Sequence, residues 1–229
     1  SEYYHYERHD IRSVLPKRLG RTLDVGCGAG LLGKALKADG AAEHVTGIEI
    51  DPAAAAEAEK NLDAVILGDV ETLELPFPDN HFDTVICADV LEHLRNPWAA
   101  TRRLAALLKP SGTFAACIPN VAYHRVIISA LAGLWPYDDA GILDRTHLRF
   151  FTLSDGHDLL TGAGLKIQKV VPLVTEHDRA LAARTDTDAL KSIVKKLFDA
   201  LESGVAADEL DMIDIRQYFV WQYIFLATK

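Results

Sequence analysis

Short apolar segments alternate with amphipathic segments between residues 20 and 118. The apolar segments have the length of strands and end at glycines, acids or turn residues. They are Thr22–Val25, His44–Ile50, Ala64–Leu67, His81–Cys87 and Leu108–Ile118. The segments between them carry apolar residues at helical spacing, and Pro52 opens one of them at a position where helices tolerate proline. Strands that alternate with helices predict a parallel sheet covered by helices on both faces.

The pattern changes after residue 118. Residues 119–150 begin as an amphipathic helix and continue as a loop rich in aromatic and ionisable groups. The remaining segments predict a helix at Leu153–Gly164 with Ser154 or Asp155 near its N-cap, strands at Lys166–Val174 and Gln217–Ala227, and charged helices over 176–204. We expect one domain over residues 1–229, with a core at 20–118 and cap-forming insertions at 119–152 and 175–212.

Composition narrows the class of partner. The chain has 229 residues and a net charge of −9, which disfavours nucleic acid as a partner. No apolar run approaches the roughly 18–20 residues of a membrane span, and the polar start has no signal-peptide core. Cys27, Cys87 and Cys117 share no metal-ligand spacing, and their odd number fits no disulfide framework. These features predict a cytoplasmic protein that holds no metal and acts on a small molecule.

The stretch LDVGCGAGLLG can be aligned in two ways with known glycine loops. Gly28, Gly30 and Gly33 match the dinucleotide pattern G-x-G-x-x-G, whereas Gly26, Gly28 and Gly30 give G-x-G-x-G directly after the strand. Asp24 precedes the loop, and its carboxylate would repel the pyrophosphate of a dinucleotide. The second alignment with Asp24 therefore favours a cofactor whose nearby end is cationic, and Gly33 is better explained as a small residue inside the first helix.

Acidic residues follow several of the predicted strands. Glu49 ends the second strand, Asp69 follows the third, and Asp89 with the sequence VLEH follows the fourth. In a parallel sheet these strand ends meet at one edge, where an acid after the second strand can accept hydrogen bonds from ribose hydroxyls. The resulting crevice would be unfavourable for phosphates and suited to a sulfonium, an amino group and the adenine amine.

The motifs LDVGCGAG, GIEIDP, GDVETLELPFPDNHFDTVICADVLEHL and LKPSGTF occur in this order. In this respect residues 20–118 resemble the class I S-adenosylmethionine-dependent methyltransferases, and GILDRTHLRFFT is similar to a segment of bacterial small-molecule methyltransferases. The resemblance implies a Rossmann-like, doubly wound α/β fold. Its seven-stranded sheet would be mostly parallel with an antiparallel last strand, with helices on both faces and a helical cap.

The same resemblance implies S-adenosylmethionine as cofactor and S-adenosylhomocysteine as product. Asp24 and the glycines would surround the methionine moiety, Glu49 would hold the ribose and Asp69 the adenine amine. Arg8 would cap the cofactor carboxylate or form a surface ion pair. The implied cofactor-binding set is Arg8, Asp24, Gly26, Cys27, Gly28, Gly30, Glu49, Ile50, Asp69, Val70, Asp89 and Val90. Asp51 is expected to cap a helix and Asp83 to be structural.

Methyl transfer from a sulfonium needs alignment and, for a hydroxyl acceptor, removal of a proton. Histidine suits that step because its pKa of about 6.5 lies near the working pH. We expect His147, His93 and Asp144 to be catalytic, although Asp144, Arg145 and His147 could equally form a polar network that fixes the cap. The expected acceptor-binding residues are Tyr123, His124, Trp135, Tyr137, Asp138 and Arg145.

These features predict a methyltransferase that modifies a hydroxyl or amine of a small metabolite, such as a saccharide or natural-product intermediate. Two rival functions fit part of the sequence. One is an NAD(P)-dependent Rossmann oxidoreductase, and the other is a cofactor-binding scaffold without catalysis. We expect a monomer or homodimer with a small-molecule acceptor and no membrane insertion.

Overall fold

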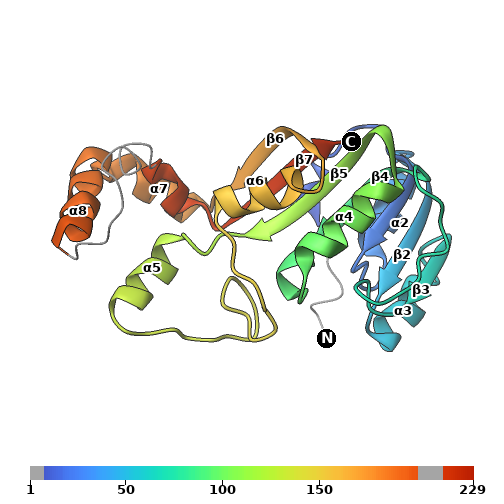
Figure 1. Cartoon of the computed structure of the whole chain (residues 1–229), viewed down its shortest axis with the longest axis horizontal. Helices are drawn as coiled ribbons and strands as arrows, with labels where there is room; N and C mark the ends of the chain where they lie inside the picture. Colours follow the sequence, from blue (N-terminus) through green and yellow to red (C-terminus); the bar gives the residue numbers. More distant parts are fainter. Residues whose placement is uncertain (1–7, 201–213) are drawn as a thin grey trace.

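A seven-stranded sheet forms the centre of the computed structural model, which describes residues 8–200 and 214–229 (Figure 1). The strand order is β3-β2-β1-β4-β5-β7-β6, and neighbours are parallel except where β7 pairs with β5 and β6. The strands are β1 (Gly20–Val25), β2 (Ala42–Glu49), β3 (Ala64–Leu67), β4 (Phe82–Ala88), β5 (Leu108–Pro119), β6 (Lys166–Leu173) and β7 (Gln222–Thr228). The predicted mostly parallel sheet with an antiparallel last strand is confirmed.

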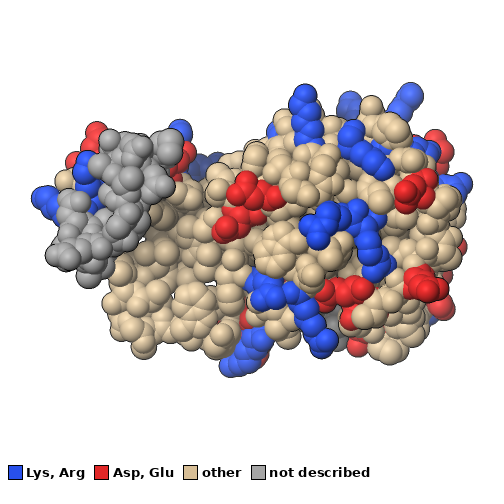
Figure 2. Space-filling view, viewed as in Figure 1, with Lys and Arg blue, Asp and Glu red and all other residues tan. Residues whose placement is uncertain are grey.

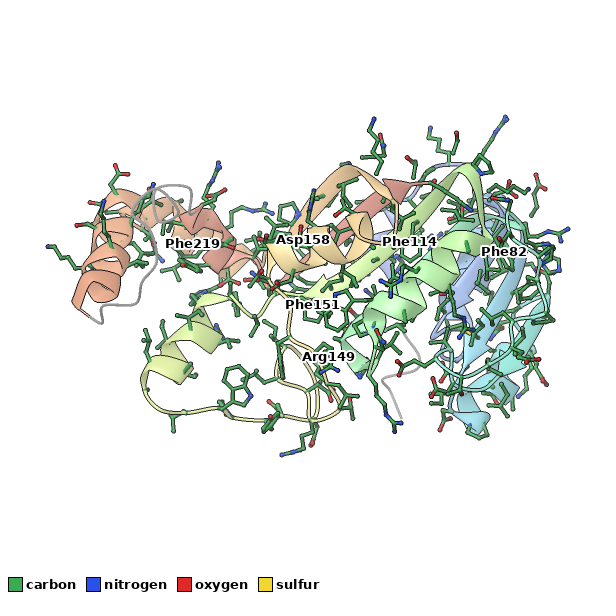
Figure 3. All side chains as sticks on the ribbon, viewed as in Figure 1. Phe82, Phe114, Arg149, Phe151, Asp158 and Phe219 are labelled. Atoms are coloured by element: carbon green, nitrogen blue, oxygen red, sulfur yellow. The ribbon has the colours of Figure 1, made fainter. Side chains whose placement is uncertain are left out.

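Helices cover both faces of this sheet, which makes the fold doubly wound. One face packs on α4 and α6, whose Leu104 and Leu160 share a buried cluster with Phe114. The other face packs on α1, α2 and α3, as Leu36 does against Ile86. Figure 3 shows Phe82 and Phe114 in this sheet beside α4. The helices are α1 (His9–Arg12), α2 (Leu31–Ala38), α3 (Pro52–Ala58), α4 (Pro97–Leu107), α5 (His124–Leu131), α6 (Leu153–Thr161), α7 (Glu176–Arg184) and α8 (Thr187–Ala200), with 3-10 turns η2 (Leu91–His93) and η3 (Ile215–Phe219).

The predicted start of α6 at Leu153 is confirmed, whereas its predicted N-cap and the predicted start of the last strand are wrong for identifiable reasons. Thr152, not Ser154 or Asp155, is the N-cap of α6, because its hydroxyl accepts from the Asp155 backbone N–H while the Asp155 carboxylate accepts from the Thr152 N–H. The last strand begins at Gln222 instead of Gln217, since the preceding residues form η3 behind an Asp214 cap. Residues 1–7 and the end of the predicted 175–212 insertion lie outside the described residues.

Register brings the candidate site to one edge of the sheet. Val25 pairs with Ile48 in β2 and with Cys87 in β4, so the residues that follow these three strands lie side by side. The insertion after β5 leaves the same edge, and α5, α7 and α8 extend beyond the end of β5 (Figure 1). The fold therefore places the glycine loop and the first insertion on a common crevice.

The three cysteines of the chain are buried and unbonded to one another. Among residues 8–200 and 214–229, no helix is both long and apolar enough to cross a bilayer.

Candidate functional site

The glycine loop between β1 and α2 follows the alignment that begins at Gly26. Gly26, Gly28 and Gly30 have φ values of 67°, 53° and 75°, a region that favours glycine. A Cβ on Gly26 would lie 2.5 Å from Val90 Cγ2, so the loop needs glycine there for space as well. Gly33 instead lies inside α2, where a Cβ would approach Leu62 to 2.4 Å. The role predicted for Gly33, close helix packing, agrees with this geometry.

Glu49 ends β2 with its carboxylate held in one orientation. Its Oε2 accepts from the Gly28 N–H at 2.8 Å, and its Oε1 accepts from the N–H groups of Ile50 and Asp51 at 2.9 Å each. Asp51 caps α3 by accepting from the Ala54 N–H at 2.8 Å, as predicted. These bonds join the glycine loop to the end of β2, beside the position expected for a ribose.

Asp24 is buried in β1 next to this loop and is only 3% exposed. Burial raises the pKa of its carboxyl to about 7; Arg8 opposes this shift and Glu49 adds to it. A cation placed beside Asp24 would stabilise its charged form.

Asp89 follows β4 with a φ of 57° and pairs with the N-terminal segment. Its Oδ2 lies 2.8 Å from Arg8 Nη1, and the Gln222 amide donates to its other oxygen. Arg8 also donates to both oxygens of Asp10 at 3.1 and 2.9 Å. Arg8 thus forms a partly buried double ion pair at the crevice. Its role as a cap for the cofactor carboxylate remains a prediction.

The remaining residues of the predicted cofactor set lie around the same edge. Asp69 Oδ1 accepts from the Glu71 N–H at 2.8 Å, Val70 is buried, and Ile50 is 65% exposed. Cys27 is buried, and burial raises the pKa of its thiol. Asp83 lies at the opposite end of β4, where it accepts from the Arg21 N–H and from Lys109, which agrees with a structural role.

The fold brings His93 and His147 together with Glu92, a residue of the VLEH sequence for which no role was predicted. The two imidazole rings meet edge to face with centroids 4.7 Å apart, and His147 Nε2 lies 4.0 Å from Glu92 Oε1. Glu92 is 1% exposed, and its backbone oxygen accepts from the N–H groups of Leu148 and Arg149 at 2.9 Å. The carboxylate nearest the His147 imidazole is therefore Glu92, on η2, which the DVLEH motif could have suggested.

Asp144 acts on this cluster through Thr146. Its Oδ1 accepts from the Thr146 N–H and hydroxyl at 2.7 and 2.6 Å, and the Thr146 hydroxyl oxygen lies 3.1 Å from His93 Nδ1. Burial alone would raise the pKa of the Asp144 carboxyl. The two hydrogen bonds from Thr146 outweigh burial, so this pKa is lowered. Burial also raises the pKa of Glu92 well above its ordinary value, with Asp89 adding to the shift.

The predicted acceptor-binding residues fall into two groups. Tyr123 and His124 face α7 and η3, where the Tyr123 hydroxyl donates to Asp178 at 2.9 Å and His124 Nδ1 bonds to the Tyr218 carbonyl at 3.1 Å. The other group lies on the loop after α5 and comprises Trp135, Tyr137, Asp138 and Arg145. In this loop Trp135 meets Phe150 edge to face, and Arg145 pairs with Asp139.

Beyond this loop the chain passes Arg149 and Phe151 before it enters α6 (Figure 3). Arg149 lies over the Trp98 ring, 5.8 Å from its centroid, and helps to line a small cleft between α4 and α6. This cleft contains none of the predicted acceptor-binding residues.

Comparison with known proteins agrees with this geometry. A family model described as a methyltransferase domain matches residues 23–116. A ubiquinone biosynthesis O-methyltransferase of Xanthomonas campestris pv. campestris is 34% identical over 189 residues, which covers 76% of this chain and 76% of that relative. One from Xylella fastidiosa is 41% identical over 110 residues, covering 44% and 43% of the two chains. The structure of a SAM-dependent methyltransferase from Archaeoglobus fulgidus superposes with a TM-score of 0.66 at 19% identity, covering 100% of this chain and 97% of that one.

Proposed function

This chain belongs to the class I S-adenosylmethionine-dependent methyltransferases, and we propose that it methylates a hydroxyl group of a small molecule. The methyltransferase activity and the S-adenosylmethionine cofactor follow from the family. The glycine alignment that begins at Gly26 fits this cofactor better than a dinucleotide, which argues against the oxidoreductase alternative. The hydroxyl acceptor and the residues that serve it are the part proposed here.

The observation that carries the proposal is the cluster of Glu92, His93 and His147 beyond the end of β4, in which Glu92 is buried. It lies beside Asp89, close to the predicted position of the methionine moiety. Transfer to a hydroxyl requires that a proton leaves, and imidazole groups are suited to receive it. The relatives named as O-methyltransferases support a hydroxyl acceptor.

The cofactor would span the crevice between β1, β2 and β4. Asp24 and the glycine loop would contact its cationic methionine end, Glu49 its ribose hydroxyls, and Asp69 its adenine amine. Arg8 would release part of its double ion pair to meet the cofactor carboxylate. This placement uses carboxylates where the cofactor is cationic or donates hydrogen bonds.

The chemical step is an in-line displacement. An oxygen lone pair of the acceptor forms the new bond to the methyl carbon, and the electrons of the C–S bond return to sulfur, which becomes a neutral thioether. The hydroxyl proton passes to the imidazole cluster, with His147 as the first candidate. Aromatic Trp135 and Tyr137 would pack on the acceptor, and Asp138 and Arg145 would bind its polar groups.

Labelled S-adenosylmethionine incubated with panels of phenols, saccharides and amines tests this function. We expect label on a hydroxyl compound and tight calorimetric binding of S-adenosylhomocysteine, with no response to NADH or NADPH. Transfer to amines alone would overturn the hydroxyl acceptor. Binding without transfer to any compound in the panels would favour the scaffold alternative.

A further inference from the structure

Glu92 carries a buried carboxylate whose two oxygens both lack a hydrogen-bond partner among the residues that the structure describes. The side chain is 1% exposed, and its Oε1 lies 4.0 Å from His147 Nε2. That distance is too long for a hydrogen bond. Buried polar groups in folded proteins nearly always bind another polar group, an ion or ordered water. An additional atom between Glu92 and the imidazoles would meet this requirement.

The two imidazoles are oriented so that they can bind such an atom. His147 Nδ1 lies 3.0 Å from the Ile142 carbonyl, and His93 Nδ1 lies 3.3 Å from the Thr146 carbonyl. A carbonyl can only accept, so each Nδ1 carries a proton, and in the neutral imidazole each Nε2 offers a lone pair to a metal. The Thr146 hydroxyl, which donates to Asp144, can accept from His93 Nδ1 as well. Histidines that bind metals are held in this manner by carbonyl or carboxylate partners.

We propose that Glu92, His93 and His147 bind one divalent transition-metal cation of the zinc class. One ligand atom from each residue lies within 4.8 Å of the other two. Metal bonds of about 2.0–2.2 Å place neighbouring ligand atoms roughly 3.0–3.6 Å apart, so small rotations of the side chains complete the site. Two imidazole nitrogens and one carboxylate oxygen favour Zn²⁺, Fe²⁺ or Co²⁺ over Mg²⁺, which prefers oxygen ligands.

The charges around the cluster also favour a cation. Asp144 and Asp89 both act on Glu92 as like charges, and Arg8, the cation that acts on it, is ion-paired with Asp89. His147 lies far along the chain from Glu92 and His93 of the DVLEH motif, which is why cysteine and histidine spacing gave no sign of a metal. Only the fold of the 142–149 segment onto η2 assembles the site.

The site has a use in the reaction, and this part rests on the proposed function. Three protein ligands leave a coordination position open, as in catalytic zinc sites. An acceptor hydroxyl in that position has a lowered pKa and loses its proton to solvent, so its oxygen attacks the methyl carbon as an alkoxide or phenolate. In the metal-loaded enzyme His147 is then a ligand, and the free imidazole serves as a base only without metal.

Metal titration of the full chain, after treatment with a chelator, tests the proposal. We expect one Zn²⁺ or Co²⁺ per chain, and visible Co²⁺ absorption typical of a nitrogen and oxygen site. His147→Ala and Glu92→Gln should each weaken Co²⁺ binding by about 100-fold or more, since even partners of metal ligands are worth about 10–100-fold. His157→Ala removes an exposed imidazole on α6 and should leave Co²⁺ binding unchanged. S-adenosylhomocysteine affinity within about twofold of the wild type would show that the variants are folded.

Equal Co²⁺ binding by the wild type and His147→Ala would overturn the metal site. Binding of Mg²⁺ to the wild type as tight as that of Co²⁺ would overturn its assignment to the zinc class. Full-rate methylation of a hydroxyl by the chelated, metal-free enzyme would remove the cation from the reaction and leave the proposed function intact. Stoichiometric metal binding without transfer to any hydroxyl acceptor would support the metal site and overturn the proposed methylation of a hydroxyl.

Discussion

The glycine loop at 26–30 and the segment at 132–150 border the same edge of the sheet, but different interactions hold them. Backbone conformation and one side-chain hydrogen bond fix the first. Its alternating glycines, Gly26, Gly28 and Gly30, have positive φ, and the Glu49 carboxylate ties the Gly28 N–H to β2. The second is held by a few contacts with η2 and by aromatic packing, and it leaves Leu134, Trp135 and Tyr137 at least 40% exposed.

Part of the surface next to the 132–150 segment is also apolar. Basic side chains lie over α4 and acidic ones over α6, whereas the region where α5 lies is largely uncharged (Figure 2). Ile128 and Leu131 of α5 are more than 60% exposed. The cofactor side is thus preorganised before any ligand binds, while the acceptor side can still adapt its contacts. Substitutions on the two sides should therefore change different measured quantities.

The largest expected effect is on turnover, from His147→Ala. Loss of the imidazole should lower kcat by about 10²–10⁴-fold, the usual contribution of a group that handles a proton in the reaction. The dissociation constant of S-adenosylhomocysteine should change less than about twofold, because the glycine loop and Glu49 remain in place. Stopped assays with labelled cofactor give the first quantity and calorimetry the second. His157→Ala is the matched control, and equal loss of turnover and cofactor binding in His147→Ala would instead place His147 in a structural network.

Glu49→Ala should have the next largest effect and the opposite profile. Its carboxylate would make charge-assisted hydrogen bonds to the ribose worth about 1.5–3 kcal/mol each, so S-adenosylhomocysteine affinity should fall by about 100-fold. Turnover at saturating cofactor should change much less. Asp51→Ala is the control, since it removes a neighbouring carboxylate that caps α3. If Asp51→Ala weakened cofactor binding as much as Glu49→Ala, general negative charge and not the Glu49 position would hold the cofactor.

The conformation of the glycine loop could be predicted because its signals are local in sequence. Asp24 lies in β1, the glycines follow this strand directly and Glu49 ends β2, so strand register alone brings them together. The arrangement around Glu92, His93 and His147 could not be predicted, because contacts between segments far apart in the sequence form it. Glu92 meets His147 only because the 142–149 segment folds onto η2, and Asp144 reaches His93 through Thr146. Likewise, the turn at η3 displaced the predicted start of the last strand, because the Asp214 cap favours a turn where the apolar pattern predicts a strand.

The pH dependence of cofactor binding should be moderate and should come from Asp24. Its pKa is about 7 in the ligand-free protein because of burial, and a cationic cofactor favours the carboxylate. Affinity for S-adenosylmethionine should therefore fall up to about tenfold per pH unit as pH decreases below about 7. Asp24→Asn should bind more weakly at pH 8 and lose this slope. Calorimetric titrations between about pH 5.5 and 8.5 measure both, and an unchanged slope in Asp24→Asn would assign the titration to another group.

The stability of the ligand-free protein should depend on pH through Asp24 in the opposite direction, and fall as pH rises. A carboxyl whose folded-state pKa lies above its unfolded value of about 3.9 stabilises the fold below that value, and this contribution is lost as pH rises through about 7. The ligand-free wild type should thus lose unfolding free energy between about pH 4 and 7 relative to Asp24→Asn. Urea unfolding at the two pH values measures the difference, and parallel stability profiles would contradict the raised pKa.

The smallest expected effect concerns the attachment of α5 to α7. Tyr123→Phe removes the hydroxyl that donates to buried Asp178 and should cost about 1–3 kcal/mol of unfolding free energy. Tyr137→Phe in the exposed loop is the control and should change the unfolding free energy by no more than about 0.5 kcal/mol.

The same contact should make stability depend on pH. Burial alone would raise the pKa of the Asp178 carboxyl, but hydrogen bonds from Thr175 and Tyr123 lower it. The stability that these bonds provide is present above the unfolded pKa of about 3.9 and is lost as pH falls. The difference between wild type and Tyr123→Phe in urea unfolding should therefore shrink below about pH 4. A raised KM with unchanged stability would instead place the Tyr123 hydroxyl on the acceptor, as the sequence analysis expected.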